Sequence, residues 1–228
     1  MAERCAIITG AGAGIGAATT LAFCREGASV LMFDRDEAAL TRTLELIREA
    51  VPGAKVDKMC ADVADERAVG MAVEKCVKNW GRLDTLVNNA AMRNYSAASS
   101  ATPEEWQDIV AVNLVGMSNL CKAAMPRLRE SGKGSVVNVS SCYAVTGRKG
   151  MALYDATKAA QLAYTRTLAF EESVHGVRVN AVCPGSTLTD FHVGRAVQSG
   201  KSVDQLRTER KDTSLIGRWA SPEEIALP

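Results

Sequence analysis

Hydrophobic and polar positions follow two alternating rhythms along the chain. Short apolar runs are typical of buried strands, and longer stretches with apolar residues three or four positions apart are typical of helices. Strands that alternate with helices predict one α/β domain over residues 1–228, built on a doubly wound parallel sheet. The predicted strands occupy 5–8, 29–33, 55–60, 84–88, 134–139 and 177–183, and the predicted helices occupy 17–25, 36–50, 65–80, 102–129 and 152–173.

Two local signals qualify the helix predictions. Thr102-Pro103-Glu104-Glu105 starts the fourth helix with an N-cap, a proline at the first helical position and a capping box. Pro126 should break or kink the last turn of the same helix, because proline lacks a backbone N–H.

The residues that directly follow the predicted strands are rich in glycine and in polar side chains. In doubly wound sheets, ligands bind beyond the carboxyl ends of the strands. The coincidence therefore predicts one ligand site at that edge of the sheet. The residues concerned are 10–16, Asp34, Asp62, Asn89, Ser141 and Pro184.

Composition and charge exclude several functional classes. Hydrophobic residues make up 47% of the chain, charged residues make up 23%, and the formal net charge is +1. This balance argues against nucleic-acid binding and against a polybasic membrane surface. No apolar run approaches the roughly 20 residues of a membrane span, so we expect neither a nucleic-acid nor a membrane partner. We also expect no signal peptide.

Cysteine and histidine usage points to a reducing compartment and to no metal. The seven cysteines are scattered and odd in number, without any Cys-x-x-Cys pair. We expect reduced, buried thiols in a cytoplasmic protein. The two histidines, His175 and His192, have no cluster of other ligands near them in the sequence, so no metal site is predicted.

Residues 9–16, Thr-Gly-Ala-Gly-Ala-Gly-Ile-Gly, connect the first strand to the first helix. Glycines permit a tight turn and let backbone N–H groups approach a ligand. The N-terminus of the helix adds unpaired N–H groups and a positive dipole end, which favour an anion such as a pyrophosphate. Counted from the strand, the spacing is Gly10-x-x-x-Gly14-x-Gly16, and the more usual dinucleotide pattern matches only from Gly12. The stretch predicts a dinucleotide phosphate site.

Asp34 ends the second predicted strand, 18 residues after Gly16. An acid at this place is expected to accept hydrogen bonds from the adenosine ribose hydroxyls. Its charge would repel a 2′-phosphate, so NAD is favoured over NADP. The adjacent Arg35 keeps NADP open, because an arginine can reach a 2′-phosphate. Asp62 has the same placement one strand later and is expected at the edge of the adenine ring.

Tyr154-Asp155-Ala156-Thr157-Lys158 is the only Tyr-x-x-x-Lys sequence in the chain. Helical positions four apart share a face, so the phenol and the ammonium should lie together. A free tyrosine has a pKa near 10, and a close ammonium favours the phenolate and lowers that pKa. The pair predicts a general acid/base suited to an alcohol and its ketone.

Two other polar residues are candidates for the same site. Ser141 lies at a strand end, 13 residues before Tyr154, where its hydroxyl can hydrogen-bond a substrate oxygen. No paired histidine and aspartate would make it a nucleophile, so a hydrolase is poorly supported. Asn113 lies in an apolar helical stretch, where a buried amide needs partners. It is either a local cap or kink residue or the holder of a water molecule.

In this order and spacing, the motifs resemble the short-chain dehydrogenase/reductase family in its classical NAD(P)-dependent form. The resemblance extends from Cys5 to about Ala226, nearly the whole chain. The family's Asn-Asn-Ala-Gly is present as residues 88–91, with Ala91 in place of the final glycine, a change expected to crowd the cofactor side slightly. The family's other motif positions match Thr9–Gly16, Asp62, Val63, Asn113, Ser141, Tyr154, Lys158, Pro184, Gly185 and Thr189.

The resemblance implies a Rossmann-like fold and a mechanism. Tyr154 would exchange a proton with the substrate, and Ser141 would orient the substrate oxygen. Lys158 would lower the pKa of Tyr154 and hold the nicotinamide ribose, and Asn113 would position a water that links Lys158 to solvent. The implied cofactor-binding residues are Gly10, Ala13, Gly14, Ile15, Gly16, Asp34, Arg35, Asp62, Val63, Asn89, Ala90, Tyr154, Lys158, Pro184, Gly185, Thr187 and Thr189.

The leading hypothesis is an NAD-dependent dehydrogenase that acts on a secondary alcohol or ketone. Its nearest rival is an NADPH-dependent carbonyl or 3-oxoacyl reductase of the same fold. A different class is a catalytically inactive NAD-binding sensor or scaffold, although the Ser-Tyr-Lys set is intact here. The residues expected to border the substrate are Met92, Arg93, Tyr95, Cys142, Tyr143, Arg148, Met151, His192 and the segment 187–215, within an irregular region over 186–220.

Two further expectations rest largely on the resemblance. Family members commonly form dimers and tetramers through two long helices, here about 103–129 and 152–173, where Ala156, Ala159, Ala160 and Ala163 would permit close approach. Ser221-Pro222-Glu223-Glu224 is a strong helix start near the end of the sequence. We therefore expect about 25 to 30 further residues after position 228, in which this helix continues and a seventh strand follows.

Overall fold

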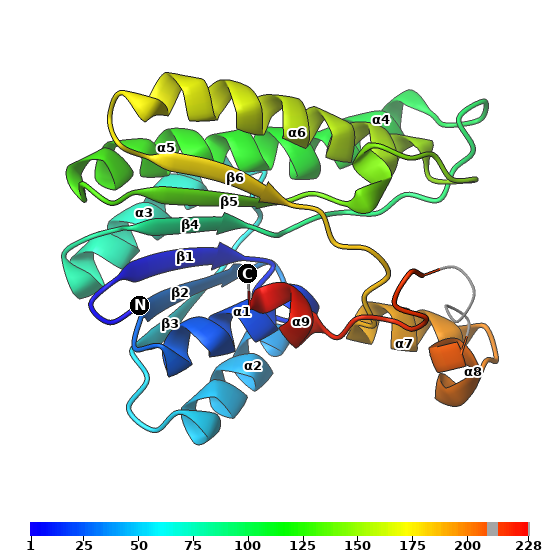
Figure 1. Ribbon diagram of the computed structural model, residues 1–228, viewed down its shortest axis with the longest axis horizontal. Helices are drawn as coiled ribbons and strands as arrows, with labels where there is room; N and C mark the ends of the chain where they lie inside the picture. Colours follow the sequence, from blue (N-terminus) through cyan, green and yellow to red (C-terminus); the bar gives the residue numbers. More distant parts are fainter. Residues whose placement is uncertain (209–213, 228) are drawn as a thin grey trace.

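Six parallel strands form the sheet at the centre of the fold (Figure 1). The computed structural model describes residues 1–208 and 214–227, to which the following account applies. The strand order is β3-β2-β1-β4-β5-β6, so the direction in which strands are added reverses between β1 and β4. This is the predicted doubly wound α/β sheet. The strands are β1 (Cys5–Thr9), β2 (Ser29–Asp34), β3 (Val56–Cys60), β4 (Thr85–Asn88), β5 (Ser135–Val139) and β6 (Arg178–Val182).

Helices cover both faces of this sheet, as Figure 1 shows. Successive side chains of a strand point to opposite faces, and β2 illustrates this. Leu31 and Phe33 belong to the core cluster that includes α3 and α5, whereas Val30 and Met32 pack with α1 and α2. The helices are α1 (Gly14–Arg25), α2 (Glu37–Ala50), α3 (Glu66–Trp80), α4 (Pro103–Val110), α5 (Met117–Glu130), α6 (Ala152–Ser173), α7 (Asp190–Gln198), α8 (Val203–Thr208) and α9 (Pro222–Ala226).

Polar side chains begin the helices where the sequence indicates. The side chain of Asp65 accepts hydrogen bonds from the first turn of α3. Thr102 and Glu105 form the predicted capping box at the start of α4, and Ser221 and Glu224 form the one at α9. Each box satisfies two backbone N–H groups that a helix N-terminus otherwise leaves unpaired.

The predicted helix over 102–129 differs from the observed one in two ways. Its middle is a π-helical segment, η1 (Ala111–Gly116), between α4 and α5. Pro126 does not end the helix, which continues to Glu130. Pro126 and Lys122 are both exposed, so water can reach the Lys122 carbonyl that the proline leaves without an N–H partner.

The helical stretch Pro103–Glu130 is long and apolar enough to cross a membrane by length and composition alone. In the structure one side of it lies against the sheet. Met117, Leu120, Ala124 and Leu128 are buried in the larger core cluster. Packing inside the fold therefore accounts for these four residues, whereas Trp106 and Val115 of the same stretch are exposed.

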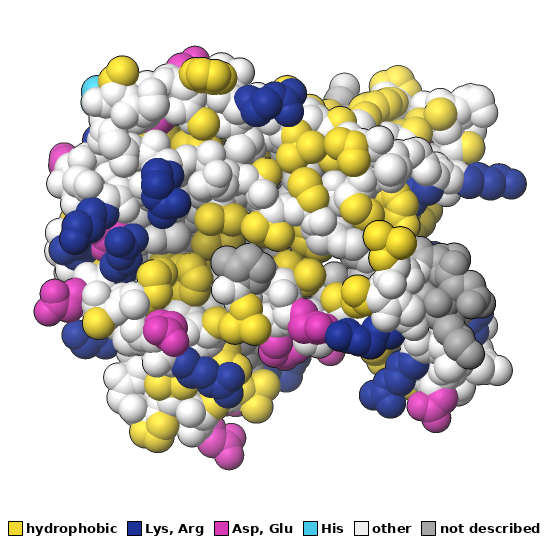
Figure 2. Space-filling view, viewed as in Figure 1, with side chains coloured by type: hydrophobic (Ala, Val, Ile, Leu, Met, Phe, Trp, Pro, Cys, Tyr) yellow, Lys and Arg dark blue, Asp and Glu magenta, His cyan; other side chains and the backbone are white. Residues whose placement is uncertain are grey.

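The segment after β6 extends past the carboxyl ends of the strands. Thr187 pairs with Ala220 in a short parallel bridge, and α7 and α8 lie beyond it (Figure 1). Trp219 anchors them, because it packs with Ala196 and Leu206 and its indole N–H donates to the Leu206 carbonyl at 2.7 Å. Figure 2 shows the surface hollowed between the upper helices and this segment. Residues 209–213 of the predicted substrate segment lie outside the described part of the chain.

Candidate active site

A cavity of about 610 Å³ opens at the carboxyl ends of the strands. Most of the residues predicted from the sequence line it, including Asp34, Ser141, Tyr154 and Lys158. Among the individually predicted residues, Gly16, Asn113, Cys142 and Met151 do not line it, and of the described part of the segment 187–215 only Thr187, Thr189, Phe191 and His192 do. Residues that line it without having been singled out from the sequence are Ala61, Val112, Val139, Ser140, Ser186 and Trp219.

The glycine turn after β1 is shaped by steric necessity. Gly10 and Gly14 have φ values of 63° and 53°, in the left-handed region that favours glycine. A Cβ at Gly16 would lie 2.1 Å from the Gly10 carbonyl oxygen, so no side chain fits there. The Asn89 amide donates to the carbonyls of Thr9 at 2.9 Å and Gly10 at 3.2 Å. Gly16 and Asn89 thus hold the turn in shape, and Gly16 does so without lining the cavity.

The N-terminus of α1 is open toward the cavity. Its N-cap, Ala13, offers no side-chain acceptor, and the first turn carries no acidic residue. Gly14 and Ile15 line the cavity at this point. The unpaired N–H groups and the positive end of the helix dipole are therefore available to an anion. The turn and the helix start fit the pyrophosphate of a dinucleotide.

Asp34 joins the end of β2 to the glycine turn. One of its carboxylate oxygens accepts from the Gly12 N–H at 2.9 Å, and the other accepts from the Asp36 N–H at 3.1 Å. Asp34 also lines the cavity, together with Arg35 and Asp62. Because each carboxylate oxygen has two lone pairs, acceptor capacity remains for ribose hydroxyls. This end of the cavity fits an adenosine moiety.

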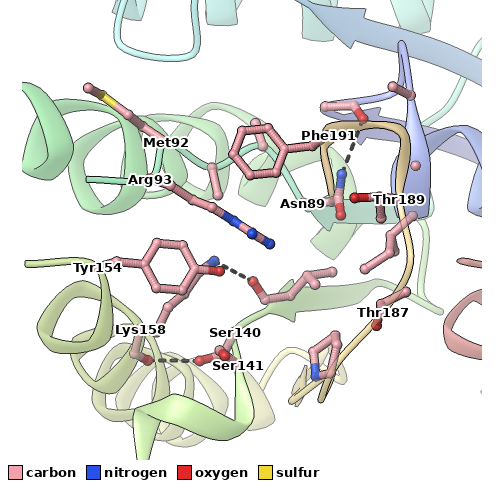
Figure 3. Close-up of a pocket in the computed structure, with 18 of the residues that line it drawn as sticks. Asn89, Met92, Arg93, Ser140, Ser141, Tyr154, Lys158, Thr187, Thr189 and Phe191 are labelled. Carbon is pink, nitrogen blue, oxygen red and sulfur yellow. Dashed lines mark hydrogen bonds between the residues drawn. The ribbon is translucent and has the colours of Figure 1, made fainter. Parts of the chain in front are cut away.

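Tyr154 and Lys158 lie on the buried face of α6, and Figure 3 shows both pointing toward the cavity. The Lys158 ammonium is 5.5 Å from the centroid of the Tyr154 ring. The expected lowering of the tyrosine pKa is not observed. Burial raises the pKa of Tyr154, and the cations that counteract this are Arg93 and Arg148 rather than Lys158. The sequence argument omitted desolvation, which disfavours the charged phenolate.

Lys158 is fully buried, with its ammonium held by two acceptors. Nζ donates to the Val139 carbonyl at 2.7 Å and to Gln161 Oε1 at 3.0 Å. Burial lowers the pKa of Lys158 to about 7. Gln161 was not predicted as a site residue, although its spacing of three from Lys158 puts both on one helix face. Its amide also donates to the Asn113 carbonyl at 2.7 Å.

Asn113 acts as a connector inside η1. Its side-chain oxygen accepts from the Met92 N–H at 2.7 Å, and its amide donates to the Met92 carbonyl and to Thr157 Oγ1, both at 3.0 Å. The amide therefore ties the loop after β4 to α6 across the π-helical segment. These partners are distant in the sequence, so the side chain joins separate elements, and the role of holding a water molecule stays a prediction.

Ser141 lies two residues after the end of β5 and is buried at the cavity wall. Its Oγ accepts from the Tyr143 N–H at 3.2 Å, at the start of the short 3₁₀ turn η2 (Cys142–Ala144). A hydroxyl that accepts in this way still has its own proton to donate. Ser141 can therefore donate a hydrogen bond to an oxygen bound in the cavity.

Comparison with known proteins places these features in a family. A family model described as short chain dehydrogenase matches residues 4–198. The chain belongs to the short-chain dehydrogenase family. The curated short-chain reductase protein NovJ of Streptomyces niveus is 38% identical over 224 residues, which cover 98% of this chain and 84% of that protein. The family and its oxidoreductase relatives make the chain an NAD(P)-dependent dehydrogenase/reductase.

Solved structures of other short-chain dehydrogenases agree with this fold. L-sorbose reductase from Gluconobacter frateurii, complexed with NADPH and L-sorbose, has a TM-score of 0.93 at 30% identity, covering 99% of this chain and 88% of that one. A 3-ketoacyl-(acyl-carrier-protein) reductase from Brucella melitensis, complexed with NADH, has a TM-score of 0.87 at 30% identity, with the same coverage. The two neighbours carry different cofactors, so the family alone does not fix the choice between NADH and NADPH.

Proposed function

We propose that this protein is an NAD-dependent dehydrogenase that transfers a hydride between a secondary alcohol or ketone and nicotinamide. The observation that carries the proposal is the convergence of Ser141, Tyr154 and Lys158 on one cavity with the glycine turn. An inactive NAD-binding sensor would not need an acid/base pair at this place. The substrate would bind at the end of the cavity bordered by Tyr154 and the segment after β6.

The cofactor would be held by groups that the fold already positions. The glycine turn and the start of α1 would bind the pyrophosphate, Asp34 the adenosine ribose, and Lys158 the nicotinamide ribose. Asp62, Val63, Asn89, Ala90, Pro184, Gly185, Thr187 and Thr189 complete the proposed set around it. When bound, the nicotinamide supplies the chemistry of hydride transfer.

The protein's own residues would handle the proton and the substrate oxygen. Ser141 would donate a hydrogen bond to that oxygen and hold it toward Tyr154. The Tyr154 hydroxyl would give up its proton when a ketone is reduced and regain one when an alcohol is oxidised. Because burial raises the pKa of Tyr154, the neutral phenol, which can donate its proton to a ketone, is its resting form. In the oxidising direction the phenol would first release its proton to solvent, and Arg93 and Arg148 would stabilise the phenolate that accepts the proton of the alcohol.

A second candidate is an NADPH-dependent carbonyl or 3-oxoacyl reductase. Arg35 favours it, because its exposed guanidinium lies next to Asp34 in the chain at the adenosine end of the cavity. Asp34 opposes it through charge repulsion with a 2′-phosphate. We infer NAD because the carboxylate is fixed by the Gly12 and Asp36 N–H groups, whereas within residues 1–208 and 214–227 no ion pair is found for the exposed Arg35 side chain.

The test is a screen of secondary alcohols and ketones with NAD(H) and NADP(H), followed at the nicotinamide absorbance, for the natural protein and for Tyr154→Phe. We expect turnover with NAD(H), and a loss of about 10²–10⁴-fold in kcat in the variant, the usual contribution of a general acid/base. NADH binding, followed by fluorescence, should survive the substitution. Near-normal turnover in Tyr154→Phe would refute the assignment, and preference for NADPH would favour the second candidate.

We further propose that the protein is located in the cytoplasm and that it forms a homo-oligomer. All seven cysteines are free, which favours a reducing compartment such as the cytoplasm.

We also propose a homodimer or homotetramer formed through the helices Pro103–Glu130 and α6. Support comes from apolar side chains that these helices leave exposed, Phe170 and Val174 above all.

A further inference from the structure

Arg93 brings a positive charge to the middle of the substrate end of the cavity. It follows β4 by five residues, and Figure 3 shows its guanidinium extending between the rings of Phe191 and Tyr154. The guanidinium carbon lies 5.7 Å from the centroid of the Tyr154 ring and 4.8 Å from that of Phe191. Arg93 is half-buried there, so a charge that usually points into solvent is held against aromatic rings.

This charge has no carboxylate partner among residues 1–208 and 214–227. Its Nη1 lies 2.9 Å from His192 Nε2, which can accept a hydrogen bond from it when the imidazole is neutral. A guanidinium offers five N–H donors. Arg93 faces His192 and the Tyr154 hydroxyl, which leaves further donors for a ligand in the cavity. Arg148, the other arginine near Tyr154, differs because its Nη2 forms an ion pair with Asp155 at 2.9 Å. Of the two, Arg93 is the one whose charge is uncompensated.

The surroundings fix Arg93 in this position. Both backbone groups of the preceding Met92 are bonded to the Asn113 side chain. On the other side, His192 Nδ1 is 2.9 Å from Thr189 Oγ1. If Nε2 accepts from Arg93, the ring proton lies on Nδ1 and is donated to Thr189. The guanidinium is therefore held in place before a ligand arrives, which reduces the entropic cost of binding.

We propose that Arg93 binds a carboxylate of the substrate, so that this enzyme acts on short hydroxy acids or oxo acids. This inference rests on the proposed function, because it concerns the group next to the reacting carbon. A substrate oxygen on the Tyr154 hydroxyl and an anion on Arg93 must be close together, since the guanidinium lies within 5.7 Å of the phenol ring. The carboxylate would be attached one or two carbons from the reacting carbon, as in 2- and 3-hydroxy acids.

A carboxylate suits this place better than a neutral group. Arginine binds carboxylates through two parallel N–H···O bonds, and such charge-assisted bonds are stronger than neutral ones. The Phe191 ring beside the guanidinium lowers the local polarity and so strengthens the ion pair. A neutral amide of the same shape would lose this charge-assisted interaction and leave the arginine uncompensated.

The kinetic test compares 2- and 3-hydroxybutyrate with the corresponding hydroxybutyramides, using NAD as oxidant. We expect the ratio of kcat/KM for acid over amide to fall about 10- to 100-fold in Arg93→Gln, as for loss of one charge-assisted hydrogen-bond pair. Arg93→Lys keeps the positive charge, so this variant should keep part of the preference for the acid over the amide. Arg148→Gln is the matched control: it also removes a cation beside Tyr154 and should slow acid and amide alike, so the ratio of the two should change far less than in Arg93→Gln, because that guanidinium pairs with Asp155. An unchanged ratio in Arg93→Gln, or a natural enzyme that prefers the amides, would overturn the proposal.

A binding test separates this proposal from the proposed function. Butyrate carries the carboxylate but no hydroxyl to oxidise, so its binding in the presence of NAD requires no turnover. By calorimetry we expect butyrate to bind at least about tenfold more tightly than butyramide, and Arg93→Gln to abolish the difference. Equal affinities in the natural protein would overturn the carboxylate site, whatever the enzyme oxidises. A clear preference for butyrate without any alcohol turnover would support the site and count against the dehydrogenase.

Discussion

At the scale of single residues, burial changes the acid–base chemistry that the sequence motif suggests. Tyr154 and Lys158 have the expected spacing, yet desolvation raises the pKa of the phenol and lowers that of the ammonium to about 7. Burial penalises the charged form of each group. The positive field at Tyr154 comes instead from Arg93, in the loop after β4, and from Arg148, in the loop six residues before Tyr154.

The role of Asp34 in the proposed preference for NAD over NADP can be tested by substitution. Asp34→Ala removes both a ribose acceptor and a charge that repels a 2′-phosphate. We expect the ratio of kcat/KM with NADP over NAD to rise about 10- to 100-fold, in line with the worth of hydrogen bonds to a charged group. The measurement is initial rates with both cofactors.

Asp36→Ala is the matched control for that substitution. Asp36 is an acid two positions on, but its carboxylate caps α2 through the Ala39 N–H. The cofactor ratio should therefore change little. If Asp36→Ala shifts the cofactor ratio as much as Asp34→Ala does, the preference for NAD results from the general loss of negative charge and not from a specific contact of Asp34 with the ribose.

Residue placement was predictable where topology determines it. Asp34, Asp62 and Ser141 follow parallel strands, and such ends must share one edge of the sheet. The sequence could not reveal Trp219, because its approach to the cavity depends on how the segment after β6 folds back. Gln161 was missed for another reason: a buried polar residue in a helix has no visible partner until the Asn113 carbonyl is in place.

At the scale of elements, α6 is the part that must be held firmly, because it carries both Tyr154 and Lys158. An ion pair joins it to α5: Arg129 donates two hydrogen bonds, of 2.6 and 2.7 Å, to the Glu172 carboxylate. Glu172 is only 4% exposed. The Arg129 guanidinium, through its hydrogen bonds, lowers the pKa of this carboxyl.

Arg129→Ala tests this clamp. The substitution leaves a buried carboxylate without its partner, so we expect a lower urea midpoint at pH 7. Because the pKa of Glu172 is lowered in the folded state, the pair stabilises above the ordinary glutamate pKa. That contribution is lost as the pH falls through the lowered value. The difference between the natural protein and the variant should therefore shrink in acid.

Arg127→Ala is the control on the same helix. Arg127 pairs with Glu130, and both side chains are exposed, so its loss should change stability little. Equal midpoints for the two variants would show that the α5–α6 ion pair does not stabilise the fold.

At the scale of the whole molecule, the sheet order decides where chemistry can occur but not which substrate is used. The reversal between β1 and β4 creates the crevice, and alternating strands and helices were enough to predict it. Relatives with this fold include an L-sorbose reductase and a 3-ketoacyl-(acyl-carrier-protein) reductase. Their different substrates illustrate that function depends on the site rather than on the fold. The seventh strand expected after residue 228 stays a prediction.

The outer face of α6 offers a surface for assembly. On α6, an exposed stripe runs along the side away from Tyr154 and Lys158. Ala156, Ala159 and Ala163 begin it and Phe170 and Val174 end it, the last two being 82% and 81% exposed. Small residues let two helices approach closely, and large exposed apolar side chains favour burial against a partner. A second copy of the chain packed along this stripe would contact the small residues closely and bury the large apolar side chains.

Ala163→Arg tests the proposed interface. Ala163 is exposed in the single chain, so an arginine there should leave the fold intact but place a long charged side chain in the interface. We expect light scattering at micromolar concentration to give a dimer or tetramer for the natural protein and a smaller species for the variant. Met71→Arg, on the exposed side of α3, should leave the assembly unchanged. A natural protein that is monomeric, or an Ala163→Arg variant that assembles normally, would contradict helix packing along α6.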